Sequence, residues 1–489
     1  MIKKPSVQFI ACIIGTFIFL CIQCAKKEEK VNILFVLADD WSYPYAGIYG
    51  NKEVKTPNLD AIASKGTVFT HAFCSAPSCT PSRASILTGN YPHTLGEGAN
   101  LVGRLDVSIP TYVKDLRKAG YRVAYDRKGW APGDYEKMGY TQNPSGDLMA
   151  IDSLLNTLGK NQPFFFWWGT QDPHRNFDLH SGALAGKNID SITVPGFLPN
   201  VPEIRGDIAD YLTEIERLDK EVGELLNKLE KANRLKNTVV IITSDNGMPF
   251  PHAKANLYDY GTRVPLIVTD FRKPQDQLIL NHSFVNLIDL TATFYDLAEV
   301  MEKPKMNSIS LLPVINKQSN EHRSEVFLER ERHCMCRAEM NYYAGYPMRA
   351  IRTQNYLYIK NFRPHRWPAG DETIPGTPSI FGDTDGGPTK IYMMDHRNEE
   401  NVKDLFQLGF GLRPAEELYD VNKDPFQIHN IAMDTSMISI KNNLSAKLNT
   451  WMMETNDPRV NPTSDIIDSY VPTTRAWITR DGIVLLDGK

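Results

Sequence analysis

The chain has 489 residues, 23% of them charged, and a formal net charge of -4 at neutral pH. This length exceeds what one hydrophobic core usually serves, so we expect a large domain and a smaller one. Because the net charge is close to zero, the protein as a whole does not attract phosphate groups. This argues against a nucleic-acid partner and against binding to a membrane surface. Any preference for anions must therefore be local.

The first 24 residues have the features of an export signal. Lys3 and Lys4 precede an apolar run over residues 9–22, which is too short for a membrane-spanning helix. Cys24 follows and is a candidate for the lipid-modified cysteine of a bacterial lipoprotein. The letters L-C-I-Q before it are a poor attachment motif, so ordinary cleavage stays open. We expect a periplasmic or cell-envelope protein whose only membrane contact would be a lipid anchor at Cys24.

Four cysteines remain after this signal. Cys334 and Cys336 form a C-x-C pair without the partner pair that a zinc site needs, and a bridge between such close neighbours has poor geometry. We expect both, and Cys74, to be packing residues. Cys79 is the exception.

Strand and helix patterns alternate over residues 31–345, which we predict to be the larger domain. Continuous apolar runs predict buried strands, and apolar residues recurring at three and four positions predict helices. Strands are expected at 31–37, 122–125, 163–168, 239–243 and 265–269, and helices at 56–63, 208–235 and 285–298. Such alternation indicates a mostly parallel sheet covered by helices on both faces.

After about residue 345 the pattern changes. Short strands are expected at 348–353, 356–360 and 417–420, and an amphipathic helix at 438–453. We therefore predict a smaller α+β domain over 346–489, with an antiparallel sheet and one helix. Residues 362–410 are rich in Pro, Gly, His and Asp, which favours long loops near the mouth of a site.

Acidic and amide side chains follow two predicted strands. Asp39 and Asp40 come after the first strand, and Asp245 and Asn246 follow residues 239–243. Taken alone, such pairs are more often turns or helix caps. At the carboxyl edge of a parallel sheet, however, three converging carboxylates need a cation. An all-oxygen set favours a hard ion, Ca²⁺ or Mg²⁺.

The stretch C-T-P-S-R-A-S-I-L-T-G at 79–89 predicts a helix that opens directly behind Cys79. Cys79 would then lie at a helix N-terminus, where free N–H groups and the positive end of the dipole favour an anion. Arg83, one turn further on, would add a fixed positive charge at the same point.

This motif resembles the signature of the type I sulfatases, hydrolases in which a formylglycine-generating maturase converts the cysteine into formylglycine. The hydrated aldehyde is the nucleophile in that family. The resemblance implies that residues 31–345 are an alkaline-phosphatase-like catalytic domain, with Arg83 beside the nucleophile. It also implies one divalent ion, Ca²⁺ in preference to Mg²⁺, held by Asp39, Asp40, Cys79, Asp245 and Asn246.

The resemblance further implies catalytic roles for three groups with basic side chains. Lys128 in R-K-G-W, His174 in D-P-H-R and Lys254 in H-A-K-A-N match positions where sulfatases hold sulfate oxygens and protonate the leaving group. The usual family pattern G-K-x-H is absent, because Trp130 takes the place of the histidine. His174 is therefore the leading candidate for the proton donor.

Several stretches look closer to N-sulfoglucosamine sulfohydrolases, namely 172–175, 244–251, 256–258, 346–349 and 451–458. They imply a sulfated saccharide substrate, with the N-sulfoglucosamine of heparin or heparan sulfate as the leading hypothesis. The alternatives are an O-sulfatase on another glycosaminoglycan or mucin-type glycan, and a formylglycine-dependent phosphoester or phosphonate hydrolase. A non-catalytic glycan-binding lipoprotein is the alternative from another class.

Glu331, Arg332, His333 and Arg349 are candidate sugar contacts. The carboxylate could pair with a glucosamine hydroxyl or amine, and the arginines with a uronate or a second sulfate. The competing interpretation is a solvated run of charges at a strand end.

Overall fold

The computed structural model describes residues 29–471, 476–478 and 483–485. The predicted export signal and Cys24 lie outside these residues. Within the described part, no helix combines the length and the apolar character needed to span a membrane.

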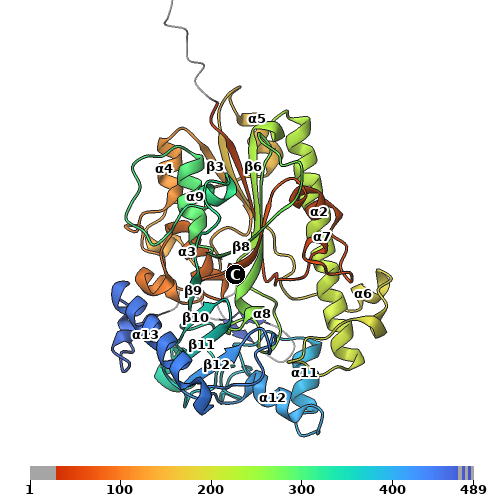
Figure 1. Cartoon of the computed structure of the whole chain (residues 1–489), viewed down its shortest axis with the longest axis vertical. Helices are drawn as coiled ribbons and strands as arrows, with labels where there is room; N and C mark the ends of the chain where they lie inside the picture. The colour runs from red at the N-terminus through yellow and green to blue at the C-terminus, as the bar shows by residue number, and fades with distance from the viewer. Residues whose placement is uncertain (1–28, 472–475, 479–482, 486–489) are drawn as a thin grey trace, which may run out of the picture.

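An eight-stranded sheet forms the centre of the larger part of the molecule (Figure 1). In spatial order its strands are β4 (Asp147–Leu148), β3 (Arg122–Arg127), β5 (Phe164–Gly169), β1 (Asn32–Ala38), β6 (Thr238–Ser244), β7 (Arg263–Asp270), β2 (Thr67–Phe73) and β8 (Ile279–Asn286). The first five run parallel, whereas β7 is antiparallel to both of its neighbours. Adjacent parallel strands therefore end at one edge, where ligands collect.

Helices cover both faces of this sheet (Figure 1). Along β1, Leu34 and Val36 enter one hydrophobic core and Ile33 and Phe35 the other, as alternation along a strand requires. One core packs against α2 (Pro57–Ala63), α5 (Ile151–Thr157) and α7 (Pro202–Lys231), and the other against α3 (Cys79–Thr88), α4 (Tyr112–Lys118) and α9 (Asp289–Leu297).

The remaining helices of this part are short. They are α6 (Ser181–Leu184), α8 (Asp259–Thr262), α10 (Leu312–Ile315) and the 3₁₀ turns η2 (Gly47–Tyr49), η3 (Pro92–Ala99), η4 (Glu136–Met138), η5 (Ile189–Ser191) and η6 (Leu235–Asn237).

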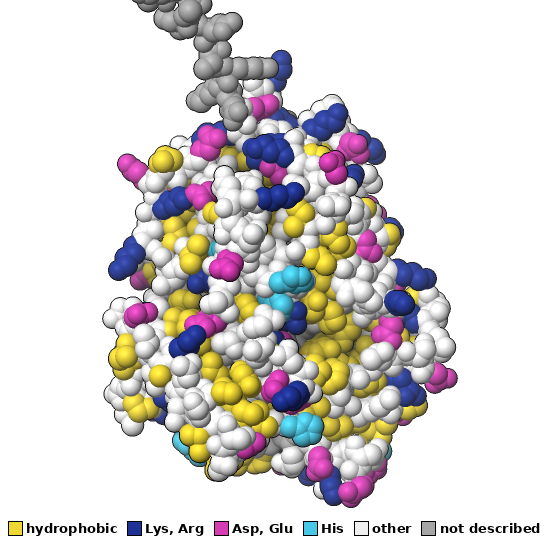
Figure 2. Space-filling model, in the orientation of Figure 1, with side chains coloured by type: hydrophobic (Ala, Val, Ile, Leu, Met, Phe, Trp, Pro, Cys, Tyr) yellow, Lys and Arg dark blue, Asp and Glu magenta, His cyan; other side chains and the backbone are white. Residues whose placement is uncertain are grey.

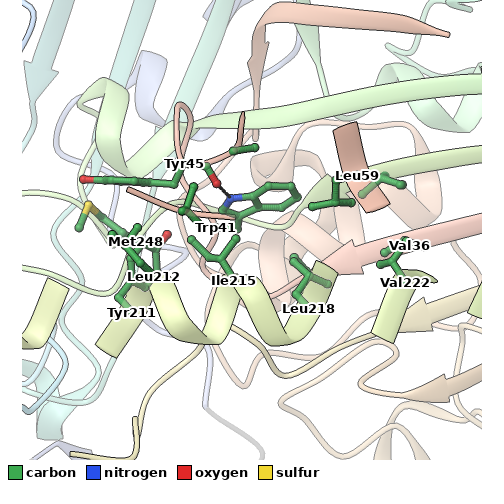
Figure 3. Close-up of a cluster of buried hydrophobic side chains, with 14 of the residues drawn as sticks. Val36, Trp41, Tyr45, Leu59, Tyr211, Leu212, Ile215, Leu218, Val222 and Met248 are labelled. Carbon is green, nitrogen blue, oxygen red and sulfur yellow. Dashed lines mark hydrogen bonds between the residues drawn. The ribbon is translucent and has the colours of Figure 1, made fainter. Parts of the chain in front are cut away.

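The long helix α7 lays an apolar stripe against the loop after β1 (Figure 3). The stripe meets the fully buried indole of Trp41, whose Nε1–H donates to the carbonyl of Tyr45 at 2.8 Å. The helix starts at Pro202 and not at residue 208 as predicted, because proline suits the first helical position. It ends at Lys231, and the 3₁₀ turn η6 follows.

A second, antiparallel sheet has the order β12 (Glu416–Asp420), β11 (Tyr356–Asn361), β10 (Met348–Thr353) and β9 (Glu325–Arg330). Helix α13 (Ile438–Glu454) packs beside it (Figure 1). The remaining elements are α11 (Pro388–Asp395), α12 (Lys403–Phe410), η7 (Glu339–Tyr342), η8 (Thr435–Met437), η9 (Pro458–Val460) and the hairpin of β13 (Ala476–Ile478) and β14 (Ile483–Leu485). The predicted fold class, an alkaline-phosphatase-like mostly parallel sheet with helices plus a small antiparallel sheet, is confirmed.

Three details differ from the sequence predictions. Strand β9 precedes residue 346 yet pairs with β10, so the small sheet takes a strand from before the predicted boundary. Val285 belongs to β8, and α9 begins only at Asp289, whose carboxylate accepts the backbone N–H of Asn286 at 3.2 Å. The segment 362–410 contains α11 and α12, and in α12 Phe406 and Phe410 form a buried apolar face.

Candidate active site

The carboxyl ends of β1 and β6 bring four predicted residues together. The strands are in register from Asn32 to Ala38, so Asp39 and Asp40 emerge beside Asp245 and Asn246. The backbone N–H of Asp40 donates to Asp245 Oδ1 at 3.2 Å, and Asn246 Nδ2 donates to Asp40 Oδ1 at 2.6 Å. All four side chains are buried.

Asp40 has a left-handed backbone conformation, with φ of 71°. Successive side chains of an extended strand point to opposite faces, so Asp39 and Asp40 would diverge if the strand continued. Aspartate tolerates the left-handed region better than most residues do. The break in the strand therefore lets two consecutive carboxylates serve one cluster.

Helix α3 begins at Cys79 itself, directly before the predicted start, so Cys79 lies at its N-terminus as expected. The thiol of Cys79 donates to Asp39 Oδ1 at 3.4 Å. Arg83 Nε donates to Asp245 Oδ2 at 2.8 Å, and its Nη2 lies 3.6 Å from Asp39 Oδ1. The carbonyls of Lys128 and Gly129 accept from Arg83 Nη1 at 2.9 and 3.0 Å. The first turn of α3 thus inserts a thiol and a guanidinium among the carboxylates.

The other three predicted catalytic residues lie against the same cluster. Lys128 Nζ is ion-paired with Asp39, and Lys254 Nζ donates to Asp40 Oδ2 at 2.7 Å. His174 Nε2 lies 3.8 Å from Asp40 Oδ2, while its Nδ1 bonds to the carbonyl of the next residue. That bond sets the orientation of the ring. Figure 2 shows one face of the whole molecule, over which acidic, basic and hydrophobic side chains are interspersed, with histidines near the middle.

Burial and charge shift the protonation of this cluster in opposite directions. Burial raises the pKa of Asp40 to about 7 and of Asp245 to about 6, against the pull of the neighbouring cations. Burial would also raise the pKa of Asp39, but Lys128, His174 and Arg83 hold it well below its usual value. The protein's own cations thus fully compensate only one of the three carboxylates.

Burial and neighbouring charges also shift the pKa values of the thiol, the imidazole and the second lysine of the site. Burial raises the pKa of the Cys79 thiol well above its usual value, and Asp39 adds to the shift. Burial and then Lys254 lower the pKa of His174 to about 4. Lys254 is itself buried, yet Asp385 and Asp40 hold its pKa well above the ordinary value.

Asp385 is a site residue that the sequence analysis missed. Its Oδ2 accepts from Lys254 Nζ at 3.0 Å, and its side chain is buried. It lies in G-D-T-D-G-G at 382–387, inside the segment predicted to form loops near the site. Acidic residues between glycines were the available signal, but nothing in the sequence pairs that segment with Lys254.

The four predicted sugar contacts are all buried, each at most 2% exposed, so the interpretation as a solvated charge run is wrong. Arg349 Nη2 donates to Glu331 Oε1 at 2.7 Å, and its Nε donates to Asp457 Oδ2 at 2.6 Å. Arg332 donates to the carbonyls of Tyr343 and Tyr470.

Internal ion pairs account for the charges of Glu331 and Arg349 without a sugar, whereas Arg332 has only backbone carbonyls as partners, and its buried Nε and Nη2 have none among the described residues. None of these partners belongs to the cluster around Asp39. His333 differs, because its Nδ1 bonds to the hydroxyl of Ser78 at 2.8 Å, directly before Cys79. Of the four, His333 is the one that the fold brings to the nucleophile position.

Two further expectations concern residues outside the cluster. Trp130 is completely buried in the core beneath α3 and α4, and its backbone N–H donates to Ser145 Oγ at 2.7 Å. The residue in place of the usual histidine therefore serves packing. Cys74, Cys334 and Cys336 are buried free thiols, as predicted for packing residues.

Several donor atoms converge closely enough to hold a metal ion. Candidate ligand atoms of Asp39, Asp40, Cys79 and His174 lie within 4.8 Å of one another. Asn246 Oδ1 is buried without a hydrogen-bond partner among the described residues, although such an atom normally has one. Three carboxylates and a free amide oxygen are the ligands that Ca²⁺ prefers.

Comparisons with known proteins agree with this geometry. The sulfatase family profile matches residues 31–300. Human N-sulphoglucosamine sulphohydrolase is 29% identical, over 89% of this chain and 92% of that protein. An ulvan-active sulfatase from Formosa agariphila is also 29% identical, over 93% of this chain and 89% of that protein. A solved protein in complex with its substrate D-glucosamine-2-N,6-O-disulfate shares the fold, with a TM-score of 0.63 and 18% identity over 89% of this chain and 100% of that one.

Proposed function

Because this chain belongs to the sulfatase family, we propose that it hydrolyses sulfate from a sulfated glycan, with the N-sulfated glucosamine of heparin or heparan sulfate as its substrate. The observation that carries the substrate is the similarity to human N-sulphoglucosamine sulphohydrolase over 89% of the chain. The stretches at 346–349 and 451–458, which resemble that subfamily, support the same substrate.

Asp39, Asp40, Asp245 and Asn246 would hold one Ca²⁺ ion next to residue 79. When present, the ion would offset charge on the sulfuryl oxygens and a formylglycine at position 79 would supply the nucleophilic oxygen. Arg83 orients the site, since its guanidinium lies against both Asp245 and Asp39.

The basic side chains have two different roles in the proposed reaction. Lys128 and Lys254 put ammonium groups on either side of the acidic pair, where they can bind two sulfuryl oxygens and stabilise the charge that grows on them. His174 is fixed through Nδ1, which leaves Nε2 facing the acidic pair. Nε2 would pass a proton to the departing nitrogen or oxygen from the protonated imidazole, a state that the charge of the bound anion would favour. The chain thus supplies charge, orientation and a proton route.

The test is a set of defined heparan disaccharides that differ in N-, 2-O- and 6-O-sulfate, with released sulfate measured by ion chromatography. We expect loss from N-sulfated glucosamine. Loss only from O-sulfated units would contradict the substrate proposal. Mass spectrometry of the peptide that contains residue 79, after co-expression with the maturase, should show formylglycine in place of cysteine.

An O-sulfatase acting on another glycan is the second candidate. The specific observation in its favour is the ulvan-active sulfatase from Formosa agariphila, which is as similar to this chain as the human enzyme is. Ulvan oligosaccharides in the same assay separate the two candidates. Sulfate release from ulvan without release from N-sulfated glucosamine would select the second.

We also propose that the protein is exported to the periplasm or cell envelope. Support comes from Lys3, Lys4 and the apolar run at 9–22, followed by Cys24. Cell fractionation of the wild type and of Cys24→Ser tests both parts. Movement from the membrane fraction to the soluble periplasmic fraction on substitution would support a lipid anchor, and recovery of the wild type in the cytoplasm would contradict export.

A further inference from the structure

Lys254 is held between two carboxylates that come from distant parts of the chain. Its Nζ donates to Asp40 Oδ2 at 2.7 Å and to Asp385 Oδ2 at 3.0 Å. Asp40 follows β1, whereas Asp385 lies between β11 and β12 of the smaller sheet. A lysine ammonium on one acceptor can pivot on its flexible stem, and a second acceptor removes that freedom.

The loop that carries Asp385 is fixed independently of Lys254. The carboxylate of Asp383 accepts from Arg337 Nη2 at 2.6 Å and from the backbone N–H of Cys334 at 2.7 Å, and it is ion-paired with Arg330. On the other side, Lys390 Nζ donates to the carbonyls of Ile380 at 2.7 Å, Phe381 at 3.2 Å and Thr384 at 2.8 Å. The fold therefore decides where the Asp385 carboxylate stands.

The same segment also contacts the neighbour of His174. Arg175 donates from Nη1 and Nη2 to the two oxygens of Asp207, at 2.8 and 2.7 Å. The hydroxyl of Thr389 donates to the same carboxylate at 2.6 Å. Gly387 lies so close to the Arg175 guanidinium that a Cβ at this position would collide with it. One short segment thus adjoins both Lys254 and the strand-end loop of His174.

We propose that Asp385 is a positioning residue, which reaches in from the smaller sheet and holds the Lys254 ammonium where it meets a sulfuryl oxygen. The inference rests on the proposed function, because it takes Lys254 to bind the sulfuryl group. Misplacing such a group by about 1 Å can cost about 100-fold in rate. Asp385 therefore acts on the reaction through Lys254 and not by touching the substrate.

The first experiment compares Asp385→Asn with the wild type. The variant keeps the size of the side chain and loses its charge. We expect kcat to fall by about 10- to 100-fold and KM to change by less than about 3-fold, as for an interaction that matters chiefly in the transition state. Asp404→Asn, the same change at an exposed position on α12, is the matched control and should alter neither constant. An Asp385→Asn enzyme with wild-type kcat would overturn the inference.

The second experiment is a double-mutant cycle. In a Lys254→Ala background, Asp385→Asn should change kcat/KM by less than about 2-fold, because the residue through which it acts is gone. If the two losses multiply, Asp385 contacts the substrate directly and the inference is wrong. Asp385→Glu, which keeps the charge, should recover part of the activity and provides the second variant if Asp385→Asn folds poorly.

The cycle uses whichever sulfated saccharide the wild type hydrolyses. A wrong assignment of the N-sulfated substrate would therefore show in the wild type and leave the cycle unaffected. Failure of the inference would show only in the variants.

Discussion

At the scale of single residues, the site depends on which charges have a partner. Asp39 has Lys128 and the guanidinium of Arg83, whereas Asn246 Oδ1 is buried with no partner among the described residues. Unpaired buried polar atoms cost free energy unless a ligand satisfies them. We therefore expect the proposed cation to be the partner of Asn246 Oδ1.

Cys79→Ser should fold like the wild type and release no sulfate. Serine is close in size to cysteine and can also donate to Asp39, so the packing should survive. The formylglycine proposed at this position is made from the thiol, which serine lacks. Thermal unfolding and sulfate release are the measurements, and wild-type turnover by the variant would remove the formylglycine claim.

His174→Gln should discriminate between leaving groups. Loss of a general acid typically costs about 100- to 10,000-fold where the leaving atom needs a proton. We expect that loss on a sulfated saccharide and a much smaller one on 4-nitrophenyl sulfate, whose phenolate leaves readily. Equal losses on both substrates, measured as kcat, would show that His174 binds the sulfuryl group and does not protonate the leaving atom.

At the scale of elements, the charged residues around β9 and β10 cross-link the smaller sheet to the chain after α13. Glu331 accepts from Arg349 at 2.7 Å and from Arg459 at 2.6 Å, and all three side chains are at most 1% exposed. Breaking a buried ion pair by removing one partner typically costs about 3–5 kcal/mol, because the remaining charge is left uncompensated. The role of this network is therefore structural.

Glu331→Gln should lower the melting temperature and leave KM within about 2-fold of the wild type, since the network does not touch the cluster around Asp39. Glu400→Gln is the control, because Glu400 has a 90% exposed side chain and its loss should change stability by no more than about 0.5 kcal/mol. An unchanged melting temperature with a strongly raised KM would restore Glu331 as a sugar contact.

At the scale of the whole molecule, the two sheets share hydrophobic contacts. One core cluster contains Phe73 and Leu257 from the larger part together with Val326, Met348 and Leu357 from the smaller sheet. The acidic cluster lies at the end of the large sheet and is closed by Asp385 from the smaller part. A ligand that binds at this site should therefore stabilise the folded state of the whole molecule.

Added Ca²⁺ should raise the melting temperature, and a chelator should reverse the rise. A ligand that binds only the folded state at 100 times its Kd stabilises it by about 2.7 kcal/mol. Asp245→Asn removes a proposed ligand charge, so it should abolish most of the response. Identical melting curves with and without Ca²⁺, recorded by calorimetry, would contradict the cation site.

The sequence alone determined those features that depend on local pattern. The apolar run after residue 30 fixed β1, proline at position 57 fixed the start of α2, and C-T-P-S-R fixed the helix that begins at Cys79. It also placed Asp39, Asp40, Asp245 and Asn246 at strand ends, because strand ends follow from where apolar runs stop.

Only the tertiary structure decided which distant residues meet. Strand β8 is half exposed and reads as polar, so its pattern was too weak to predict, and β9 joined the small sheet by pairing with β10. Glu331 and Arg349 resembled surface charges until the fold buried them against Arg459 and Asp457. Asp385 reaches Lys254 across 131 positions of chain, and such a contact depends on global packing, which no local sequence pattern encodes.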